Sequence, residues 1–222
     1  MKREIKITAD GSSTLYIPEM DENYHSDHGA LQEAMHVFIE NGLNTIDSEL
    51  IEVFEMGFGT GLNALLTSIE AKKQKKSISY TGIEAYPVTE EHLLQINYLK
   101  LVGEEHKNDF EKMHSTQWNQ KTSINESFEF MKVLEKIESY HLPENKFDLI
   151  YYDAFGPRAQ ASMWEIPILE KMFKALKPGG ILVTYCAQGQ FKRNLKTLGF
   201  NVIPLTGPPG KREMTKGIKV KR

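Results

Sequence analysis

Short apolar runs alternate along the chain with stretches in which apolar residues recur at helical spacing. Runs of bulky residues, which predict buried strands, occur at 50–56, 77–84, 147–153, 181–185 and 199–203. Helical spacing is found at about 30–41, 62–66, 163–176 and 190–198. Strands made of continuous apolar runs are those covered by helices on both faces. The alternation therefore predicts an α/β fold with a mostly parallel sheet.

The stretch from 101 to 145 carries the weakest pattern. Between Phe128 and Ile137 an apolar residue recurs at every third position, which predicts a helix from about 126 to 140. A further strand is then expected near 110–118, and another helix is expected from about 87 to 100.

The first residues lie outside the strand–helix repeat. Segments of alternating polarity at 4–8 and 14–17 flank Asp10-Gly11, a pair typical of tight turns, and they predict a β-hairpin. We expect a single domain spanning 1–222, with the hairpin and the first helix as an extension over 1–45 and the core over 46–222.

Composition narrows the class of protein. A chain of 222 residues can bury one full core, and its net charge of −3 gives no general preference for nucleic acid. The charged amino terminus predicts no secretory leader, and no apolar run reaches the ~18–20 residues of a membrane span. One cysteine, Cys186, fits a reducing compartment, so we expect a cytoplasmic protein. His25 and His28 have no accompanying ligand set, so no metal site is expected.

A glycine turn follows the first buried run and leads into a helix. Gly57, Gly59 and Gly61 alternate with other residues, and helical spacing begins at Leu62. Glycines allow close approach of the backbone to a ligand, and a helix N-terminus offers N–H groups to it. Glu84 ends the next expected strand, where a carboxylate can accept both hydroxyls of a ribose. A nucleoside-containing ligand is expected, with a solvated carboxylate at 84 as the alternative.

Asp153 ends another expected strand. In open α/β sheets the ligand lies outside the carboxyl ends of the strands, so Asp153 should face the same crevice as Glu55 and Glu84. The sequence Asp153-Ala-Phe-Gly-Pro resembles the Asp/Asn-Pro-Pro-Tyr/Phe loop of amino-group methyltransferases. An amine nucleophile needs acceptors for its protons, which Asp153 and a backbone carbonyl can supply while Phe155 packs on the substrate. The alternative role for Asp153 is that of a structural strand-end cap.

These motifs resemble those of one broad class of enzymes and, within it, those of one narrower family. The Gly-x-Gly-x-Gly turn, with Glu55 just before it, is similar to motif I of class I S-adenosylmethionine (SAM) methyltransferases, which have a Rossmann-like sheet of seven strands. More narrowly, the chain resembles the methyltransferase domain of MnmC-type tRNA 5-methylaminomethyl-2-thiouridine biosynthesis enzymes. The stretches that carry this resemblance are 24–33, 55–63, 153–157 with 163–164, 178–180 and 210–214.

The narrower resemblance implies SAM-dependent methylation of the amine of 5-aminomethyl-(2-thio)uridine at the tRNA wobble position. The residues that would hold SAM are Glu55, Gly57, Gly59, Gly61, Asn63, Glu84, Ser123 and Asp153, with Asp153 also catalytic. Those that would contact the substrate are Tyr24, Phe155, Trp164, Lys211 and Arg212. Ser123 stands where the family has an aspartate near adenine, so a backbone contact is expected there. SAM is the only cofactor expected, without FAD, because the flavin-dependent oxidase half of the family has no counterpart here.

Basic residues are concentrated near the end of the sequence. From Lys192 onward there are nine basic residues against a single acidic one, Glu213. A basic end on an otherwise acidic chain can contact the phosphates of an RNA. The family resemblance implies that this partner is the anticodon region of a tRNA. Lys211 and Arg212 are the pair expected to contact it, and a solvated pair of terminal strands is the alternative.

Two other functions remain open at this point. One is a methyltransferase that acts on a small amine, and the other is a module that binds tRNA or SAM without catalysis. Polyamine synthases share the fold, but their usual aspartate among the glycines is absent from 57–61. Methylation of tRNA that carries the aminomethyl base would separate these functions. The sequence does not determine the oligomeric state.

Overall fold

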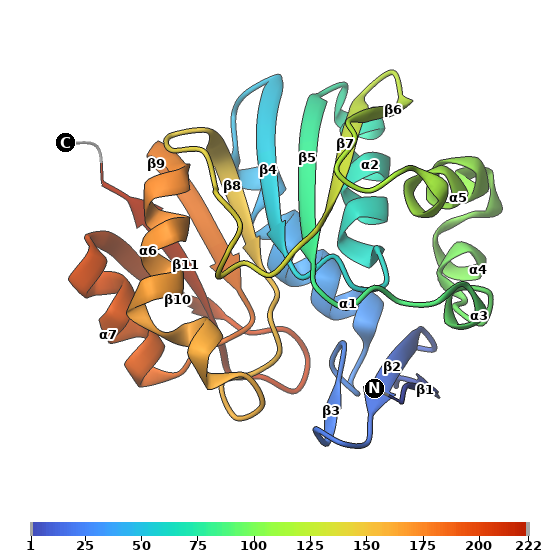
Figure 1. Ribbon diagram of the computed structural model, residues 1–222, viewed down its shortest axis with the longest axis horizontal. Helices are drawn as coiled ribbons and strands as arrows, with labels where there is room; N and C mark the ends of the chain where they lie inside the picture. Colours follow the sequence, from blue (N-terminus) through green and yellow to red (C-terminus); the bar gives the residue numbers. More distant parts are fainter. Residues whose placement is uncertain (1, 221–222) are drawn as a thin grey trace.

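The computed structural model describes residues 2–220 and contains a large mixed sheet between two layers of helices (Figure 1). The strands lie in the order β10–β11–β9–β8–β4–β5–β7–β6. Their bounds are β4 (Leu50–Met56), β5 (Ser77–Glu84), β6 (Thr122–Asn125), β7 (Phe128–Leu134), β8 (Phe147–Tyr152), β9 (Leu176–Thr184), β10 (Phe200–Thr206) and β11 (Glu213–Lys219). The five strands from β9 to β7 pair in parallel, and β6, β10 and β11 are antiparallel. The predicted α/β fold is confirmed, with β6 as an eighth, edge strand.

Each face of the sheet has its own apolar core. On β4, Ile51 and Val53 pack with α2, whereas Phe54 and Met56 pack with α6 on the opposite face. This alternation is what a strand with both faces covered requires. The helices are α1 (Ala30–Ala34), α2 (Leu62–Gln74), α3 (Glu90–Leu93), α4 (Tyr98–Val102), α5 (Lys107–Ser115), α6 (Ile166–Ala175) and α7 (Gly189–Leu198). A π-helical segment, Met35–Glu40, continues α1 as far as the helix predicted there.

A small antiparallel sheet forms beside the carboxyl ends of the central strands. It consists of β1 (Glu4–Ile7), β2 (Ser13–Ile17) and β3 (Glu22–Asn23) in that order. The predicted hairpin is confirmed as β1 and β2, and β3 adds a short third strand. In Figure 1 this sheet lies below the large one, close to α1. Its position brings Tyr24, just after β3, next to the glycine turn at Gly59.

The stretch from 101 to 145 differs from its prediction in two places. Residues 128–134 of the predicted helix form β7 instead, and residues 110–115 of the predicted strand belong to α5. In β7 the exposed Glu129 separates the buried Phe128 and Phe130, which is the alternation of a strand. This alternation is present in the sequence, but it overlaps with apolar residues at every third position, a spacing that indicates a helix. The helix predicted over 87–100 is divided into α3 and α4.

Candidate active site

A pocket opens at the carboxyl ends of the central strands. Its walls are the glycine turn after β4 and the segments that follow β5, β7 and β8, together with Tyr24 and His25. Backbone hydrogen bonds tie these strand ends together, because Gly57 N–H donates to Ile83 O at 3.1 Å and Asp153 N–H donates to Met56 O at 3.1 Å. The sheet therefore holds side chains from distant parts of the sequence around one cavity.

The glycine turn has a conformation that side chains tolerate poorly. Gly57, Gly59 and Gly61 have φ angles of 91°, 52° and 78°. A Cβ at Gly57 would lie 2.8 Å from the carbonyl oxygen of Asp153, so the turn can approach the end of β8 only without a side chain there. Gly57 and Gly59 line the pocket, whereas Gly61 lies outside its lining and precedes α2, packed against His114.

Asn63, in the first turn of α2, connects two carboxyl groups. Its side-chain nitrogen donates to Glu55 Oε1 at 2.9 Å and to Asp153 Oδ2 at 2.8 Å. Glu55 is 1% exposed and lies behind the glycine turn, outside the pocket lining. Burial is the main reason that the pKa of Glu55 is raised well above its usual value, and the charge of Asp153 raises it further. The structure thus places Asn63 and Asp153 at the pocket, with Glu55 supporting them from behind.

Asp153 titrates close to neutral pH. Its pKa is raised from 3.8 to about 7, first by burial and then by the negative charge of Glu33. The hydrogen bond from Asn63 and the positive charge of Lys211 act in the opposite direction. At neutral pH a substantial fraction of Asp153 is therefore ionised and able to accept a proton.

Replacing Asp153 with asparagine is expected to stabilise the protein at pH 8 and to have little effect at pH 4. Because the folded-state pKa of about 7 lies above the ordinary value of 3.8, the stability that the neutral carboxyl contributes is present below pH 3.8 and is lost as the pH rises through 7. Asparagine stays neutral throughout, so thermal unfolding at pH 8 should occur several degrees higher, since each kcal/mol shifts Tm by about 2–4 °C in a chain of this size. The exposed Asp47, replaced in the same way, is the control. Equal destabilisation of Asp153→Asn at both pH values would contradict the raised pKa.

Glu84, at the end of β5, is fixed by two backbone groups. Its Oε2 accepts the N–H of Gly59 at 2.9 Å, and its Oε1 accepts the N–H of Tyr86 at 2.8 Å. Each carboxylate oxygen has a further lone pair available. Because Glu84 lines the pocket, those lone pairs are available to a ligand bound there.

Aromatic side chains form the outer part of the pocket. The rings of Tyr24 and Phe155 meet edge to face at 5.1 Å between centroids, and both residues line the cavity. Trp164 is a correction to the prediction, since it is 4% exposed and does not line the pocket. Its ring nitrogen donates to Phe155 O at 2.8 Å, so Trp164 supports the loop that carries Phe155.

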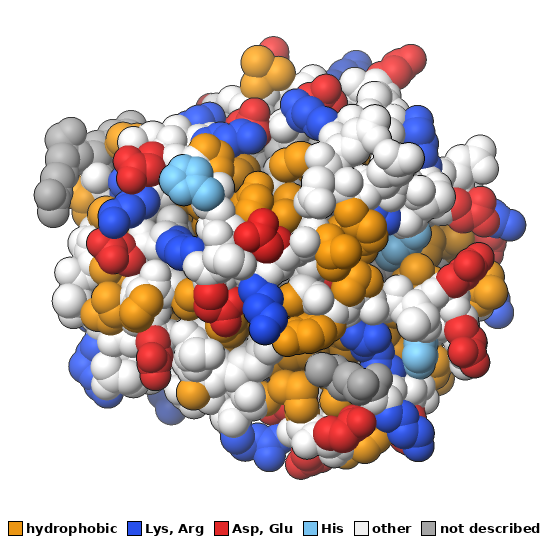
Figure 2. Space-filling view, viewed as in Figure 1, with side chains coloured by type: hydrophobic (Ala, Val, Ile, Leu, Met, Phe, Trp, Pro, Cys, Tyr) orange, Lys and Arg blue, Asp and Glu red, His pale blue; other side chains and the backbone are white. Residues whose placement is uncertain are grey.

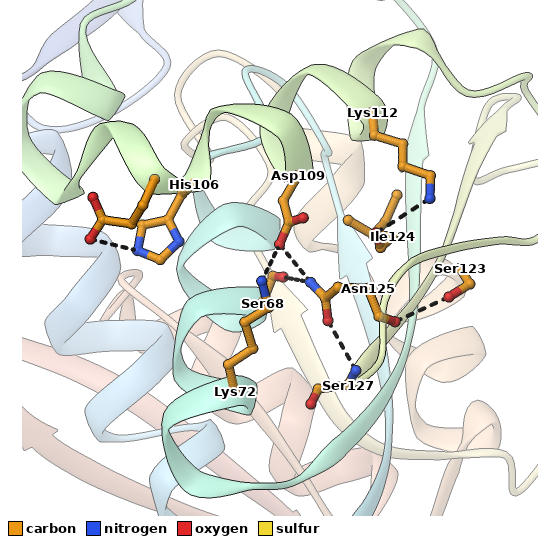
Figure 3. Close-up of polar contacts among 10 residues, drawn as sticks. Ser68, Lys72, His106, Asp109, Lys112, Ser123, Ile124, Asn125 and Ser127 are labelled. Carbon is orange, nitrogen blue, oxygen red and sulfur yellow. Dashed lines mark hydrogen bonds and ion pairs between the residues drawn. The ribbon is translucent and has the colours of Figure 1, made fainter.

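Ser123 lies away from the pocket, which corrects the prediction that it contacts the cofactor. It belongs to β6 and pairs with Glu129, in the first half of β7, whereas the pocket begins after β7 ends. Its hydroxyl donates to Asn125 O at 3.0 Å, and Asn125 in turn donates to Ser68 of α2 and Asp109 of α5 (Figure 3). The side of the pocket that was expected to lie near residue 123 is lined by Glu135–Glu138.

Lys211 and Arg212 do not act as one exposed pair. Lys211 is directed inward, where its ammonium pairs with Glu33, so its predicted contact with tRNA phosphate is corrected. Arg212 is exposed, as predicted for a phosphate contact.

Other basic side chains near the end of the sequence also make internal contacts. The ammonium groups of Lys192, Lys216 and Lys219 lie 2.6 Å from Glu213 Oε2, 2.7 Å from Thr45 Oγ1 and 2.7 Å from Leu176 O, respectively. Basic and acidic side chains are interspersed over the face drawn in Figure 2. Lys221 and Arg222 lie outside the described residues.

Two contributors to the site were missed by the sequence reasoning. Arg3 donates to the hydroxyl of Tyr24 at 2.9 Å and to Pro87 O at 3.0 Å, which ties the small sheet to the segment after β5. Nothing in the sequence around Arg3 marks this contact. Glu33 lies within the stretch 24–33 that carries the family resemblance; it is buried, and its charge raises the pKa of Asp153.

Residues 2–220 contain neither a cluster of metal-ligating side chains nor a helix suited to a membrane. Within this range no group of three or more His, Cys, Asp or Glu side chains is arranged to hold a metal ion. His25 is partly buried and its Nδ1 lies 3.1 Å from Thr14 Oγ1. Over the same residues, no helix has both the length and the apolar character that crossing a membrane requires.

Comparison with known proteins gives one family match and a group of relatives. Residues 97–220 match a family described as S-adenosyl-L-methionine-dependent methyltransferase. The chain is 31% identical over 215 residues to the tRNA 5-methylaminomethyl-2-thiouridine biosynthesis bifunctional protein MnmC of Cupriavidus necator, covering 90% of this chain and 32% of the relative. The protein of the same name from Actinobacillus pleuropneumoniae is 25% identical over 96% of this chain and 35% of its own length. The chain thus spans about a third of the length of these relatives.

A solved structure resembles the whole fold. MnmC2 from Aquifex aeolicus matches with a TM-score of 0.82 and 22% identity, over all of this chain and 71% of the other. At this identity the match concerns the fold, and it includes the small amino-terminal sheet because the alignment covers the full chain.

Proposed function

This chain belongs to the family of S-adenosyl-L-methionine-dependent methyltransferases, and from that premise we propose that it methylates the primary amine of 5-aminomethyl-(2-thio)uridine at the tRNA wobble position. The observation that carries this proposal is the position of Asp153, a carboxyl group with a pKa of about 7 that faces the pocket beside the glycine turn. The names of the relatives, which align along most of this chain, supply the tRNA substrate.

The pocket residues fit SAM. The side-chain oxygen of Asn63 is buried and has no hydrogen-bond donor among residues 2–220. Its nitrogen already serves two carboxyl groups, so the oxygen is available to an ammonium such as that of the methionine part of SAM. The first N–H groups of α2 would hold the methionine carboxylate, and Glu84 would hold the ribose. When bound, SAM supplies a methyl group attached to a positively charged sulfur.

The remaining chemistry is the preparation of the amine. An aliphatic amine is mostly protonated at neutral pH, since its pKa is near ~10.4, and an ammonium has no lone pair for attack. Asp153 can accept one proton and hold the nitrogen in line. The N–C bond then forms as the C–S bond breaks, with the electron pair remaining on sulfur. Phe155 and Tyr24 would pack against the flat base.

The proposal also includes the region of the tRNA that the protein contacts. We infer that the anticodon region approaches the mouth of the pocket, with Arg212 contacting a phosphate. A tRNA substrate of this kind is modified in the cytoplasm, which agrees with the expectation from the single cysteine. Because the relatives are about three times longer than the aligned part, the complete bifunctional activity is not assigned to these residues.

Comparison of two acceptors tests the proposal. Purified protein and SAM are incubated with intact tRNA bearing 5-aminomethyluridine or with the free nucleoside, and the nucleosides are analysed by mass spectrometry. We expect methylation of the wobble nucleoside in intact tRNA and far slower reaction of the free nucleoside. Reaction of small amines alone would favour the small-molecule methyltransferase. SAM binding without any product would favour a binding module.

A further inference from the structure

A partly buried ion pair joins two segments that are far apart in the sequence. The ammonium of Lys211, between β10 and β11, pairs with the carboxylate of Glu33 in α1. Only 8% of the Glu33 side chain and 31% of the Lys211 side chain are exposed. The other oxygen of Glu33 accepts the N–H of Ser26 at 2.8 Å. Removing a charged side chain from water costs free energy, which the opposite charge of its partner offsets. Each of the two side chains therefore stabilises the position of the other.

The same ammonium lies against an aromatic ring behind the pocket. Lys211 Nζ is 3.9 Å from the centroid of Tyr185, and the Tyr185 hydroxyl donates to Ala154 O at 2.8 Å. Ala154 directly follows Asp153, so Lys211, Tyr185 and the end of β8 form one packed group. Gly210 lies against the ring of His28, where a side chain would not fit, and this contact fixes the loop that carries Lys211.

The two charges of the pair act on Asp153 in opposite directions. Glu33 raises the pKa of Asp153 and Lys211 lowers it, while burial remains the largest cause of the raised value. Through Tyr185, whose hydroxyl donates to Ala154 O, the ion pair packs against the end of β8 that leads into Asp153, and its two charges act on this carboxyl group in opposite directions.

The neutral form is favoured in three other titratable groups near Asp153. Burial lowers the pKa of His25 to about 4, so this ring is neutral at pH 7. Burial also raises the pKa values of Tyr185, after β9, and Glu55, in β4, well above their usual ranges. Their neutral forms are favoured, which leaves Glu33 and Lys211 as the charges that most directly affect Asp153.

We propose that the Glu33–Lys211 ion pair is a positioning element that sets how readily Asp153 takes the proton of the substrate ammonium. This inference rests on the proposed amine substrate and deepens it. In the step concerned, one proton passes from the ammonium nitrogen to a carboxylate oxygen of Asp153. A neutral amine and a neutral carboxyl group result. Neither Glu33 nor Lys211 needs to touch the substrate.

Opposite changes in pH dependence test the pair. Single-turnover methyl transfer to aminomethyl tRNA at saturating SAM should fall on the acidic side as Asp153 becomes protonated. Lys211→Met removes a positive charge, so the midpoint of this fall should rise by roughly one pH unit. Glu33→Gln removes a negative charge, so the midpoint should fall. The double variant should return towards the wild type because the two changes oppose each other.

Matched variants separate charge from structure. Lys211→Arg keeps the charge and should leave the midpoint unchanged, and Lys192→Met disrupts a comparable ion pair with Glu213 and should do the same. Shifts in the same direction for Lys211→Met and Glu33→Gln, or no shift in either, would overturn the proposal. Where Lys211→Met fails to fold, Glu33→Gln and Lys211→Arg decide. A lower midpoint in Glu33→Gln together with an unchanged midpoint in Lys211→Arg supports the proposal. Any other result overturns the proposal.

A direct titration makes the result independent of the methyl acceptor. Protein labelled with ¹³C-aspartate and saturated with S-adenosylhomocysteine gives a carboxyl signal for Asp153, assigned by its loss in Asp153→Asn. The titration midpoint of this signal should shift in the two variants as described for the rate. Opposite shifts without any tRNA methylation would uphold the ion-pair inference and reject the proposed function. Methylation with an unchanged titration midpoint would do the reverse.

Discussion

Replacing Asp153 with alanine is expected to abolish methyl transfer while SAM affinity stays within about tenfold of the wild type. Asp153 is the carboxyl group that faces the pocket and can accept the amine proton, and loss of a general base typically costs ~10²–10⁴ in rate. Asn63 loses its hydrogen bond to Asp153 in this variant but keeps the one that it donates to Glu55, so the glycine turn and α2 should keep their positions. Single-turnover transfer and calorimetric titration with SAM measure the two effects separately.

The matched variant for this prediction is Asp153→Asn, which keeps the shape of the side chain but cannot accept the proton as a carboxylate does. It should lose transfer nearly as completely as the alanine variant. Loss of SAM binding in both variants would make Asp153 a cofactor-binding residue instead, and retention of transfer in the asparagine variant would remove it from the proton step.

Replacing Glu84 with glutamine is expected to weaken SAM binding by about a hundredfold or more. The carboxylate accepts two backbone N–H groups and is proposed to accept two ribose hydroxyls, and hydrogen bonds to a charged group contribute about 1.5–3 kcal/mol each. The amide of glutamine would direct a donor towards either Gly59 N–H or Tyr86 N–H. Calorimetric titration with SAM gives the change.

Glu49→Gln is the control for the loss of one negative charge, since Glu49 is exposed and lies just before β4, far from the pocket. Its SAM affinity should match that of the wild type. Equal affinity of the Glu84 variant and the wild type would exclude a ribose contact at the end of β5.

The sequence alone predicted the elements whose signals are local. The strands β4, β5 and β8 and the second half of β9 are short apolar runs, and Gly57 occupies a position with positive φ that the glycine spacing marks. Glu84 and Asp153 could be placed because strand ends in a parallel sheet meet at one edge. These predictions needed no knowledge of which residues touch across the fold.

Contacts between distant segments could not be predicted in the same way. Lys211 was expected to contact tRNA phosphate because it lies in the basic end of the sequence, but its ammonium pairs with Glu33, 178 positions earlier in the sequence. Ser123 was assigned to the pocket because it stands where the family has an aspartate near adenine, but it lies on the edge strand β6 and pairs with Glu129, away from the carboxyl ends of the central strands. Trp164 carries a polar group that a buried tryptophan must satisfy, and its partner, Phe155 O, becomes apparent only in the fold.

Transfer of a labelled methyl group from SAM to tRNA tests the central claim most directly. Two samples of the same tRNA are compared, one with 5-aminomethyl-(2-thio)uridine at the wobble position and one with unmodified uridine there. Label in the wobble nucleoside of the first sample only, and none with Asp153→Ala, is the predicted result. Equal labelling of both samples, or no labelling of either by protein that binds SAM, would contradict the claim that this pocket methylates the wobble amine.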